Sequence, residues 1–406
     1  MAESKVGPSV PKEKKRKTND CVLERFCEEF GDSFGRFKEL LYNLKQKQTA
    51  LGAFEIGSCN AADPDHGYCF TKAACSIRPS DVTIAFGSLF LEPFKVLNEL
   101  FSKKSLSKDG PVRMCVEKLM TFMLDKEIQK ALEDIQDCTD ETELSVLSAT
   151  HLFSQLSLSP AFTVDNRKPG LWRCPCTGKK CLKSGRYGKI NYGDTSIGNT
   201  EVWHGFLDLI MDGAEVLVYT VDGENDTDRD TDSTRDVKQK DFEMTDVSAG
   251  SSIAQVAAET IVYSFYYRYL HPEHSHFLIP SIGISYFSVV FYFYDSVNDV
   301  LLGSTQFPLM NLESGNPCKL NITTLFAIWM VLNHKHLCNG LNLVGPDQIP
   351  KSHFAELAKS KLEVYKEGLK RRDVDIRRKK VQSVDPKFFI DSKFLVPSAL
   401  NFDDYY

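Results

Sequence analysis

Two apolar runs separated by an Asp-Gly pair constrain the fold of this chain more than any other feature. The runs are residues 206–211 and 214–221, with Asp212-Gly213 between them. Glycine adopts the positive φ of a type I′ turn, so this pattern predicts a β-hairpin with a two-residue loop. In that register Asp208 lies opposite Leu217, and residues 217, 219 and 221 share its face of the sheet.

Asp208 is a candidate site residue because apolar residues flank it in the first run. An ionised carboxylate buried in a strand is costly unless it is paired or binds a metal. The alternative is a solvated sheet face, on which Phe206 would be partly exposed.

The rest of the chain predicts an α/β (α+β) fold, in which helices flank a mixed β-sheet. The 406 residues, 42% of them hydrophobic, suffice for two ordinary domains or for one large domain with appendages. Val22, Phe26 and Phe30 recur at helical spacing, and further stripes continue that pattern. We therefore expect a helical domain over residues 21–160, after a disordered basic tail at 1–20.

A core domain is expected over residues 161–345, with an acidic insertion at 222–246. Strands are predicted at 206–211, 214–221, 285–295 and 300–307, and a helix at 253–269 with Ser251-Ser252 as caps. Residues 346–406 are predicted as a basic helix, within 352–380, followed by an irregular tail. The helix could follow a phosphate backbone or simply be a solvated face.

The central region, residues 201–269, resembles the PD-(D/E)xK, or restriction-endonuclease-like, nuclease superfamily, as a divergent eukaryotic member. The resemblance rests on Glu201, on Gly205-x-x-Asp208 with its hairpin, on an Asp-x-Lys motif, and on a following helix that carries Gln255. It implies a Mg²⁺ ion held by acidic groups, with a lysine that orients water or stabilises negative charge.

Carried over residue by residue, the resemblance makes Glu201, Asp208 and Asp236 the Mg²⁺ ligands. Lys238 becomes the charge-stabilising catalytic residue, and Gln255 a supporting or substrate contact. Two carboxylates about 4 Å apart repel by about 4 kcal/mol at an effective dielectric near 20, and a hard cation removes that cost. The competing position at the end of the hairpin, Thr220-Val-Asp222, lacks both the acid and the lysine.

Residues 174–189 hold a thiol cluster and a basic loop. Cys174, Cys176 and Cys181 could give three zinc thiolates, completed by His204 or His151, although free thiols are the alternative. The candidate phosphate contacts, with a solvated loop as the alternative, are Lys179, Lys180, Lys183 and Arg186.

Three other segments give weaker expectations. The spacing of acids in the insertion does not fit a calcium loop, because Thr231 and Val237 replace the required Gly and Glu. The histidine-rich segment 271–276 is predicted as a loop after the central helix. Helix 253–269 is expected to be amphipathic, with Gln255 and Glu259 on its polar face, unless that face belongs to the site.

Location and partners follow from charge and hydropathy. The first residues carry no secretory signal and the longest apolar stretch is too short and broken for a membrane span, so a nuclear or cytoplasmic protein is expected. The basic run at 11–17 favours the nucleus. The leading function is a Mg²⁺-dependent nuclease acting on DNA or RNA. The alternatives are a catalytically degenerate module that binds nucleic acid or a protein, and a structural protein whose acidic insertion binds a basic partner.

Overall fold

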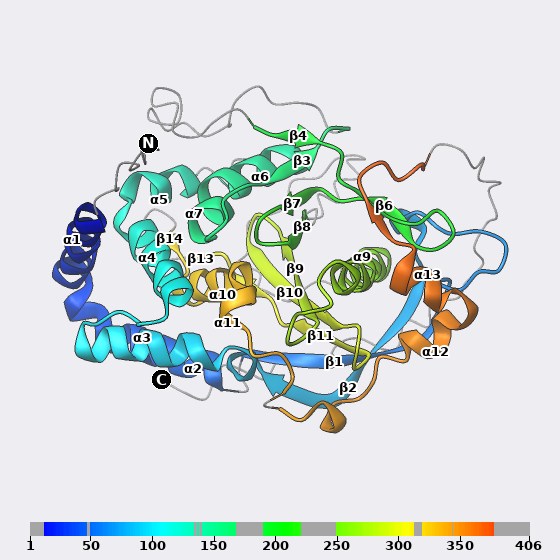
Figure 1. The fold of residues 1–406 in the computed structure, drawn as a ribbon, viewed down its shortest axis with the longest axis horizontal. Helices are drawn as coiled ribbons and strands as arrows, with labels where there is room; N and C mark the ends of the chain where they lie inside the picture. The colour runs from blue at the N-terminus through cyan, green and yellow to red at the C-terminus, as the bar shows by residue number, and fades with distance from the viewer. Residues whose placement is uncertain are drawn as a thin grey trace, which may run out of the picture.

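The computed structural model of the protein describes residues 12–376 except 47–48, 134, 136–137, 139, 168–189, 221–248, 312–318 and 343. A large mixed sheet crosses the molecule, and helices cover both of its faces (Figure 1). The predicted class, a mixed sheet flanked by helices, is confirmed. The division into domains stays a prediction.

Most helices come from the N-terminal part of the chain. They are α1 (Lys12–Phe30), α2 (Phe34–Lys45), α3 (Leu91–Lys103), α4 (Gly110–Leu124), α5 (Lys126–Glu133), α6 (Glu141–Ser148) and α7 (Ser154–Leu156). Asp140 caps α6 by accepting hydrogen bonds from two backbone amides, as its position before an apolar segment predicts. Because α1 begins at Lys12, the expectation of a disordered tail through residue 20 was wrong for residues 12–20.

The main sheet has ten strands. They are β1 (Ala50–Cys59), β2 (Cys75–Ala85), β3 (Thr163–Asp165), β4 (Tyr192–Gly193), β7 (Leu209–Met211), β8 (Val216–Thr220), β9 (Leu278–Ile284), β10 (Ser288–Asp295), β11 (Val300–Ser304) and β12 (Phe307–Pro308). Their order is β2-β1-β11-β10-β9-β8-β7-β3-β4, and β12 pairs with β10. The pairs β8/β9 and β3/β4 are parallel, and the remaining pairs are antiparallel.

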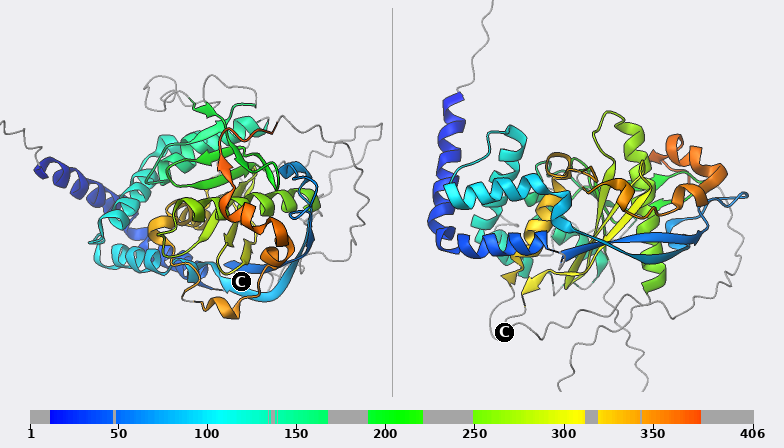
Figure 2. Two further views of the ribbon diagram at one scale, coloured as in Figure 1. Left: turned by 45° about the vertical axis from the view of Figure 1, so that its right-hand side comes forward. Right: turned by 90° about the horizontal axis from the view of Figure 1, so that it is seen from below.

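Strands β1 and β2 correct the expectation that residues 21–160 are helical. They form a long hairpin whose first strand pairs with β11, so this part of the chain completes the same sheet as the central region (Figure 2). Helical periodicity on either side of the hairpin concealed it, because strand alternation over residues 50–59 is broken by two bulges.

The predicted hairpin is present as β7 and β8, but its loop is longer than expected. Four residues, 212–215, make the turn, and Met211 pairs with Val216. Glu215 takes the left-handed conformation with φ of 56°, while a side chain at Gly213 would collide with Ser159. The register therefore moves by two residues. Since the shift is even, residues 209–211 and 216–220 keep their predicted faces. Asp208 lies outside β7 and its carboxylate accepts from the Thr220 hydroxyl, so the expectation that it shares a face with residues 217 and 219 was wrong.

Helix α9 (Ala249–Leu270) connects β8 to the parallel strand β9 and confirms the predicted central helix. It begins before Ser251-Ser252, so these residues lie inside the helix and not at its cap. The helix is apolar nearly all round and its core-facing side packs on Ile210, Leu217 and Ile279 of the sheet. The expected polar face is therefore absent from the described part of α9, because Glu259 is buried too.

Two apolar cores lie on the two faces of the sheet. The larger core joins the N-terminal helices to α10 (Ile322–Leu332), which precedes α11 (His334–Leu337). The smaller core joins α9 to the C-terminal helices α12 (Phe354–Ala358) and α13 (Leu362–Glu367). The expected long basic helix is thus two short helices with buried apolar residues, and residues 377–380 lie outside the described chain.

Two small sheets complete the fold. One contains β5 (Ser196–Gly198), β6 (His204–Phe206) and β15 (Lys370–Arg371), and the other contains β13 (Met310–Asn311) and β14 (Lys319–Leu320). The first of these joins the C-terminal segment to the residues that precede Asp208. The start of the expected 206–211 strand belongs to this separate sheet, with a break at residues 207–208.

Candidate functional site

Asp208 lies in that break, immediately before β7. Its Oδ2 atom accepts hydrogen bonds from the backbone amide and the hydroxyl of Thr220, both at 2.9 Å. The carboxylate is therefore directed toward the end of β8, at the open end of the hairpin. A carboxylate can accept about four hydrogen bonds, so these two do not by themselves exhaust it.

A second acid lies beside Asp208 on the neighbouring strand. The amide of Asp165, at the end of β3, donates to the carbonyl of Asp208 at 3.1 Å. The Asp165 carboxylate is almost fully buried and pairs with Arg167, whose guanidinium also stacks on Phe206 at 3.3 Å from the ring centroid. Asp165 is thus held as an ion pair, which is the arrangement that burial of a charge requires.

Gln255 and Glu259 form a polar pair in the first half of helix α9. The Gln255 amide donates to Glu259 at 2.9 Å, and Glu259 is buried. The pKa of Tyr219 is raised well above its usual range by burial, and the charge of Glu259 adds to that effect. Thr260, the residue after Glu259, has its Oγ1 atom 2.6 Å from Oγ of Ser281, and Ser281 pairs with Leu217 of β8, so this part of α9 lies over β8 and β9.

Glu201 is not placed as the resemblance implies. It lies in a turn between β5 and β6 rather than in a helix, its side chain is 58% exposed, and its Oε2 atom is 3.9 Å from Nζ of Lys361. Asp236 and Lys238 lie outside the described residues. So do the zinc candidates Cys174, Cys176 and Cys181, and the phosphate-contact candidates Lys179, Lys180, Lys183 and Arg186.

The two histidines considered as partners of those cysteines are both buried. His204 lies in β6, where its Nδ1 atom is 2.9 Å from the carbonyl of Val202. His151 lies in a turn of π-helix, Ala149–Phe153, inside the N-terminal helical core. Among the described residues, eight cysteines are present and no disulfide joins them.

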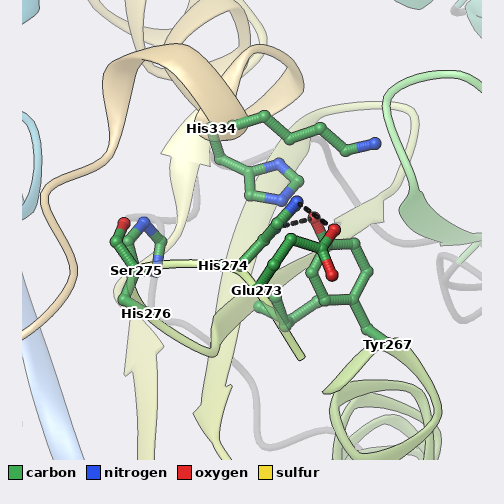
Figure 3. A pocket seen from close by; sticks show the side chains of 8 residues that line it. Tyr267, Glu273, His274, Ser275, His276 and His334 are labelled. Carbon is green, nitrogen blue, oxygen red and sulfur yellow. Dashed lines mark hydrogen bonds and ion pairs between the residues drawn. The ribbon is translucent and has the colours of Figure 1, made fainter. Parts of the chain in front are cut away.

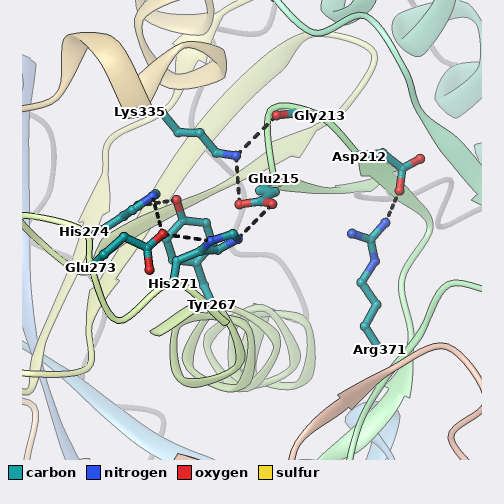
Figure 4. Close-up of polar contacts among 9 residues, drawn as sticks. All are labelled: Asp212, Gly213, Glu215, Tyr267, His271, Glu273, His274, Lys335 and Arg371. Carbon is teal, nitrogen blue, oxygen red and sulfur yellow. Dashed lines mark hydrogen bonds and ion pairs between the residues drawn. The ribbon is translucent and has the colours of Figure 1, made fainter. Parts of the chain in front are cut away.

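A second polar cluster, not expected as a site from the sequence, surrounds the loop after α9. His271, Glu273 and His274 bring one potential ligand atom each to within 4.8 Å of one another. Glu273 Oε1 is 3.4 Å from Nδ1 of His271 and 3.7 Å from Nε2 of His274. Figure 4 shows the three side chains converging at the end of α9. The segment is a loop, as predicted.

Each histidine of this cluster has a further partner on its other ring nitrogen. Nε2 of His271 is 3.3 Å from Oε1 of Glu215, and Nδ1 of His274 is 2.6 Å from the Tyr267 hydroxyl (Figure 4). Lys335 holds Glu215 through a 2.8 Å ion pair. Glu215 is the left-handed residue of the hairpin turn, so the four-residue turn supplies this contact.

A pocket of about 220 Å³ adjoins the cluster and is lined by Glu273, His274, His276 and His334, among others (Figure 3). Nδ1 of the buried His334 is 3.2 Å from the carbonyl of Val331, so this nitrogen carries the proton. Its Nε2 atom is then a buried lone-pair acceptor with no partner among the described residues. His276 has the same character, since Nε2 bonds to Cys338 and Nδ1 has no partner in that part of the chain.

The electrostatics favour unprotonated groups. Burial lowers the pKa of His274, and the positive charge of His271 adds to this effect. Burial also lowers the pKa of His276 and, much further, that of His334. The pKa of Glu273 is lowered by a hydrogen bond from its own backbone amide and by His271. Neutral imidazoles and an ionised carboxylate are the forms that bind metals.

No known family, curated protein or solved structure that was compared with this chain matches it. In the described part of the chain, no helix has the length and apolar character needed to cross a membrane.

The second cluster could have been noticed in part from the sequence. A signal for the second cluster was present in His271-Pro-Glu-His274-Ser-His276, but the sequence does not reveal that Glu215 and Lys335 approach it.

Proposed function

We propose that this protein is a divalent-metal-dependent nuclease that hydrolyses phosphodiester bonds at a site around Asp208. The observation that carries the proposal is the pair of hydrogen bonds from Thr220 to Asp208. The segment 221–248, which contains Asp236-Val-Lys238, begins at the residue after Thr220. The second acid and the lysine thus belong to the segment that leaves β8 beside Asp208.

The helix that follows residues 221–248 also supports a site at Asp208. The chain re-enters the described structure in α9, where Gln255 bonds to Glu259 and the next residue, Thr260, contacts Ser281, which pairs with Leu217 of β8. The hairpin followed by a helix with Gln255 is the order that the resemblance to PD-(D/E)xK nucleases implies. These contacts support placing Gln255 at the same end of the sheet as Asp208.

The described residues around Asp208 supply only part of a metal-binding site. Among the described residues, no group of three ligands gathers around Asp208 as three do around Glu273. Asp236 is therefore needed as the second Mg²⁺ ligand, while the exposed position of Glu201 gives it no support as a third. When bound, the ion would polarise a phosphoryl oxygen. Lys238 would stabilise the negative charge that develops there.

A cleavage assay tests this proposal. The full-length protein is incubated with single-stranded, double-stranded and branched DNA and RNA, with Mg²⁺ or Mn²⁺. Asp208→Asn keeps an acceptor for Thr220, and we expect it and Lys238→Ala to reduce cleavage at least 100-fold. The matched control is Asp347→Asn, because Asp347 is exposed in the turn Pro346–Gln348. Absence of wild-type cleavage on all substrates would contradict the nuclease proposal.

A second candidate function is binding without catalysis. It is favoured by the absence, among the described residues, of a three-ligand group around Asp208. A degenerate nuclease-fold module would bind oligonucleotides or a protein partner in the presence of EDTA. Fluorescence anisotropy at low salt separates the two readings, since a module of this kind binds labelled DNA or RNA that it never cuts.

A further inference from the structure

The cluster at the end of α9 has the composition of a transition-metal site and lies apart from Asp208. Glu215 is in the turn of the β7–β8 hairpin, whereas Asp208 and Thr220 are at its open end. The cluster contains two imidazoles and one carboxylate whose candidate ligand atoms lie within 4.8 Å of one another. Imidazole with carboxylate suits zinc and its neighbours in the first transition row, whereas magnesium and calcium prefer oxygen ligands.

Two of the three ligand-to-ligand distances are close to the edges of a zinc coordination tetrahedron. Zinc bonds to nitrogen and oxygen of about 2.0 to 2.1 Å give ligand-to-ligand separations of about 3.3 Å. Glu273 Oε1 is 3.4 Å from His271 Nδ1 and 3.7 Å from His274 Nε2. Small side-chain rotations would therefore place an ion between the three atoms.

The outer partners of the two histidines are those that metal sites use. A histidine that binds a metal usually donates its other N–H to a carboxylate, carbonyl or water, which fixes its tautomer and ring orientation. Glu215 occupies that position for His271, and the Tyr267 hydroxyl occupies it for His274. Lys335 in turn fixes Glu215. Each candidate ligand ring is thus oriented from a different element.

A second, independent observation is the buried His334 in the adjoining pocket. No described residue partners its Nε2 acceptor, and leaving such an atom buried is costly. Tyr267, Glu273, His274 and His334 line one pocket of about 220 Å³. A water or other donor bound at a metal would give this nitrogen a partner.

We propose that His271 through Nδ1, His274 through Nε2 and Glu273 through a carboxylate oxygen bind one Zn²⁺ ion, with a fourth position open to the pocket lined by His334. The site is independent of the proposed nuclease site, and neither proposal requires the other. Three protein ligands with an open position are the arrangement of zinc sites that bind an exchangeable water or ligand.

Metal titration of the full-length chain tests the site. After EDTA treatment and removal of the chelator, Zn²⁺ binding is measured by calorimetry and Co²⁺ binding by visible absorption. We expect the His271→Asn/His274→Asn variant to lose one bound ion. The matched control is His353→Asn, because His353 forms a similar exposed pair with Glu356 in α12. Equal stoichiometry and affinity in the double variant and the wild type would overturn the site.

Two further controls distinguish the loss of a ligand from misfolding, and this site from metal bound by cysteines. Glu273 is 66% exposed, so Glu273→Gln removes a ligand without disturbing the core, and we expect at least tenfold weaker binding from it. Zinc bound at thiolates such as Cys174 would remain in the double variant and give an intense sulfur-to-cobalt band. If all bound Co²⁺ shows that band and none is lost from the double variant, the proposal is wrong.

If the cluster is a metal site, removing a group that orients one of its histidines should weaken Zn²⁺ binding. Tyr267→Phe removes only the hydroxyl that bonds to His274, and we expect 10- to 100-fold weaker Zn²⁺ binding, as for comparable positions in other sites. Unchanged Zn²⁺ affinity in Tyr267→Phe would show that this hydroxyl does not orient His274 as a ligand. That result would count against a metal site at this cluster.

Discussion

Thr220 donates two hydrogen bonds to Asp208 at the end of β8. Its backbone amide and its hydroxyl each lie 2.9 Å from the same carboxylate oxygen. Thr220→Val removes the hydroxyl contact and retains the amide contact. We expect a loss of about 1 to 2 kcal/mol in the free energy of unfolding, measured by urea denaturation. Thr220→Ser keeps the hydroxyl and is expected to lie within about 0.5 kcal/mol of the wild type. Equal stability of the two variants would show that the hydroxyl contributes nothing.

Asp165 depends on Arg167 to remain buried. The carboxylate is 2% exposed, and Arg167 donates to both of its oxygens while stacking on Phe206. Arg167→Met leaves that charge without its cation, and we expect a loss of about 2 kcal/mol because the arginine is itself half exposed. Adding Asp165→Asn should recover part of the loss, since the buried group is then neutral. Urea denaturation of both single variants and the double variant measures the coupling.

Tyr219 has a buried hydroxyl with no hydrogen-bond partner among the described residues. Its ring covers Gly283 on the neighbouring parallel strand, where an added Cβ would lie 2.4 Å from ring atoms. We expect Tyr219→Phe to be neutral or to stabilise the fold by about 1 kcal/mol, because it removes an unsatisfied polar group and keeps the ring. Gly283→Ala should destabilise the protein. A clear loss of thermal stability in Tyr219→Phe would reveal a partner for the hydroxyl.

The C-terminal segment is attached to the core by Phe354. This buried ring contacts the rings of Trp203, Phe265, Tyr294 and Tyr365. Phe354→Ala should cost about 3 to 5 kcal/mol, and Phe354→Leu much less, because it leaves a smaller cavity. Protease digestion provides a second measurement. The alanine variant is expected to be cleaved within residues 344–376 before the sheet unfolds, whereas simultaneous loss of both parts would show one cooperative unit.

Local pattern was enough to predict the hairpin, the helix α9 and the mixed sheet. It did not predict β1 and β2, whose place in the sheet depends on pairing between Leu51 and Ser304, far apart in the chain. It also missed the turn length, because Glu215 is fixed by Lys335 and His271 rather than by its neighbours in sequence.

The candidate sites likewise depend on contacts that sequence patterns do not predict. Asp208 was singled out from the cost of burying a carboxylate, but in the structure it is only half-buried. Its partner Thr220 depends on the register of the hairpin. The three candidate ligands around Glu273 are neighbours in sequence, but the approach of Glu215 and Lys335 from separate elements is not encoded by local spacing.

His334 makes stability depend on pH. Burial, assisted by the charges of His276, Lys335 and His274, lowers its pKa well below that of an unfolded chain, which is about 6.5. Below that pH the unfolded state binds a proton that the folded state does not, so stability falls as pH decreases. One such histidine accounts for about 1 kcal/mol between pH 7 and pH 5.5. We expect His334→Asn, measured by urea denaturation with EDTA present, to lose less stability over this interval than the wild type, whereas His353→Asn at a half-exposed position should resemble the wild type. An unchanged pH dependence in His334→Asn would mean that this histidine is protonated in the folded protein.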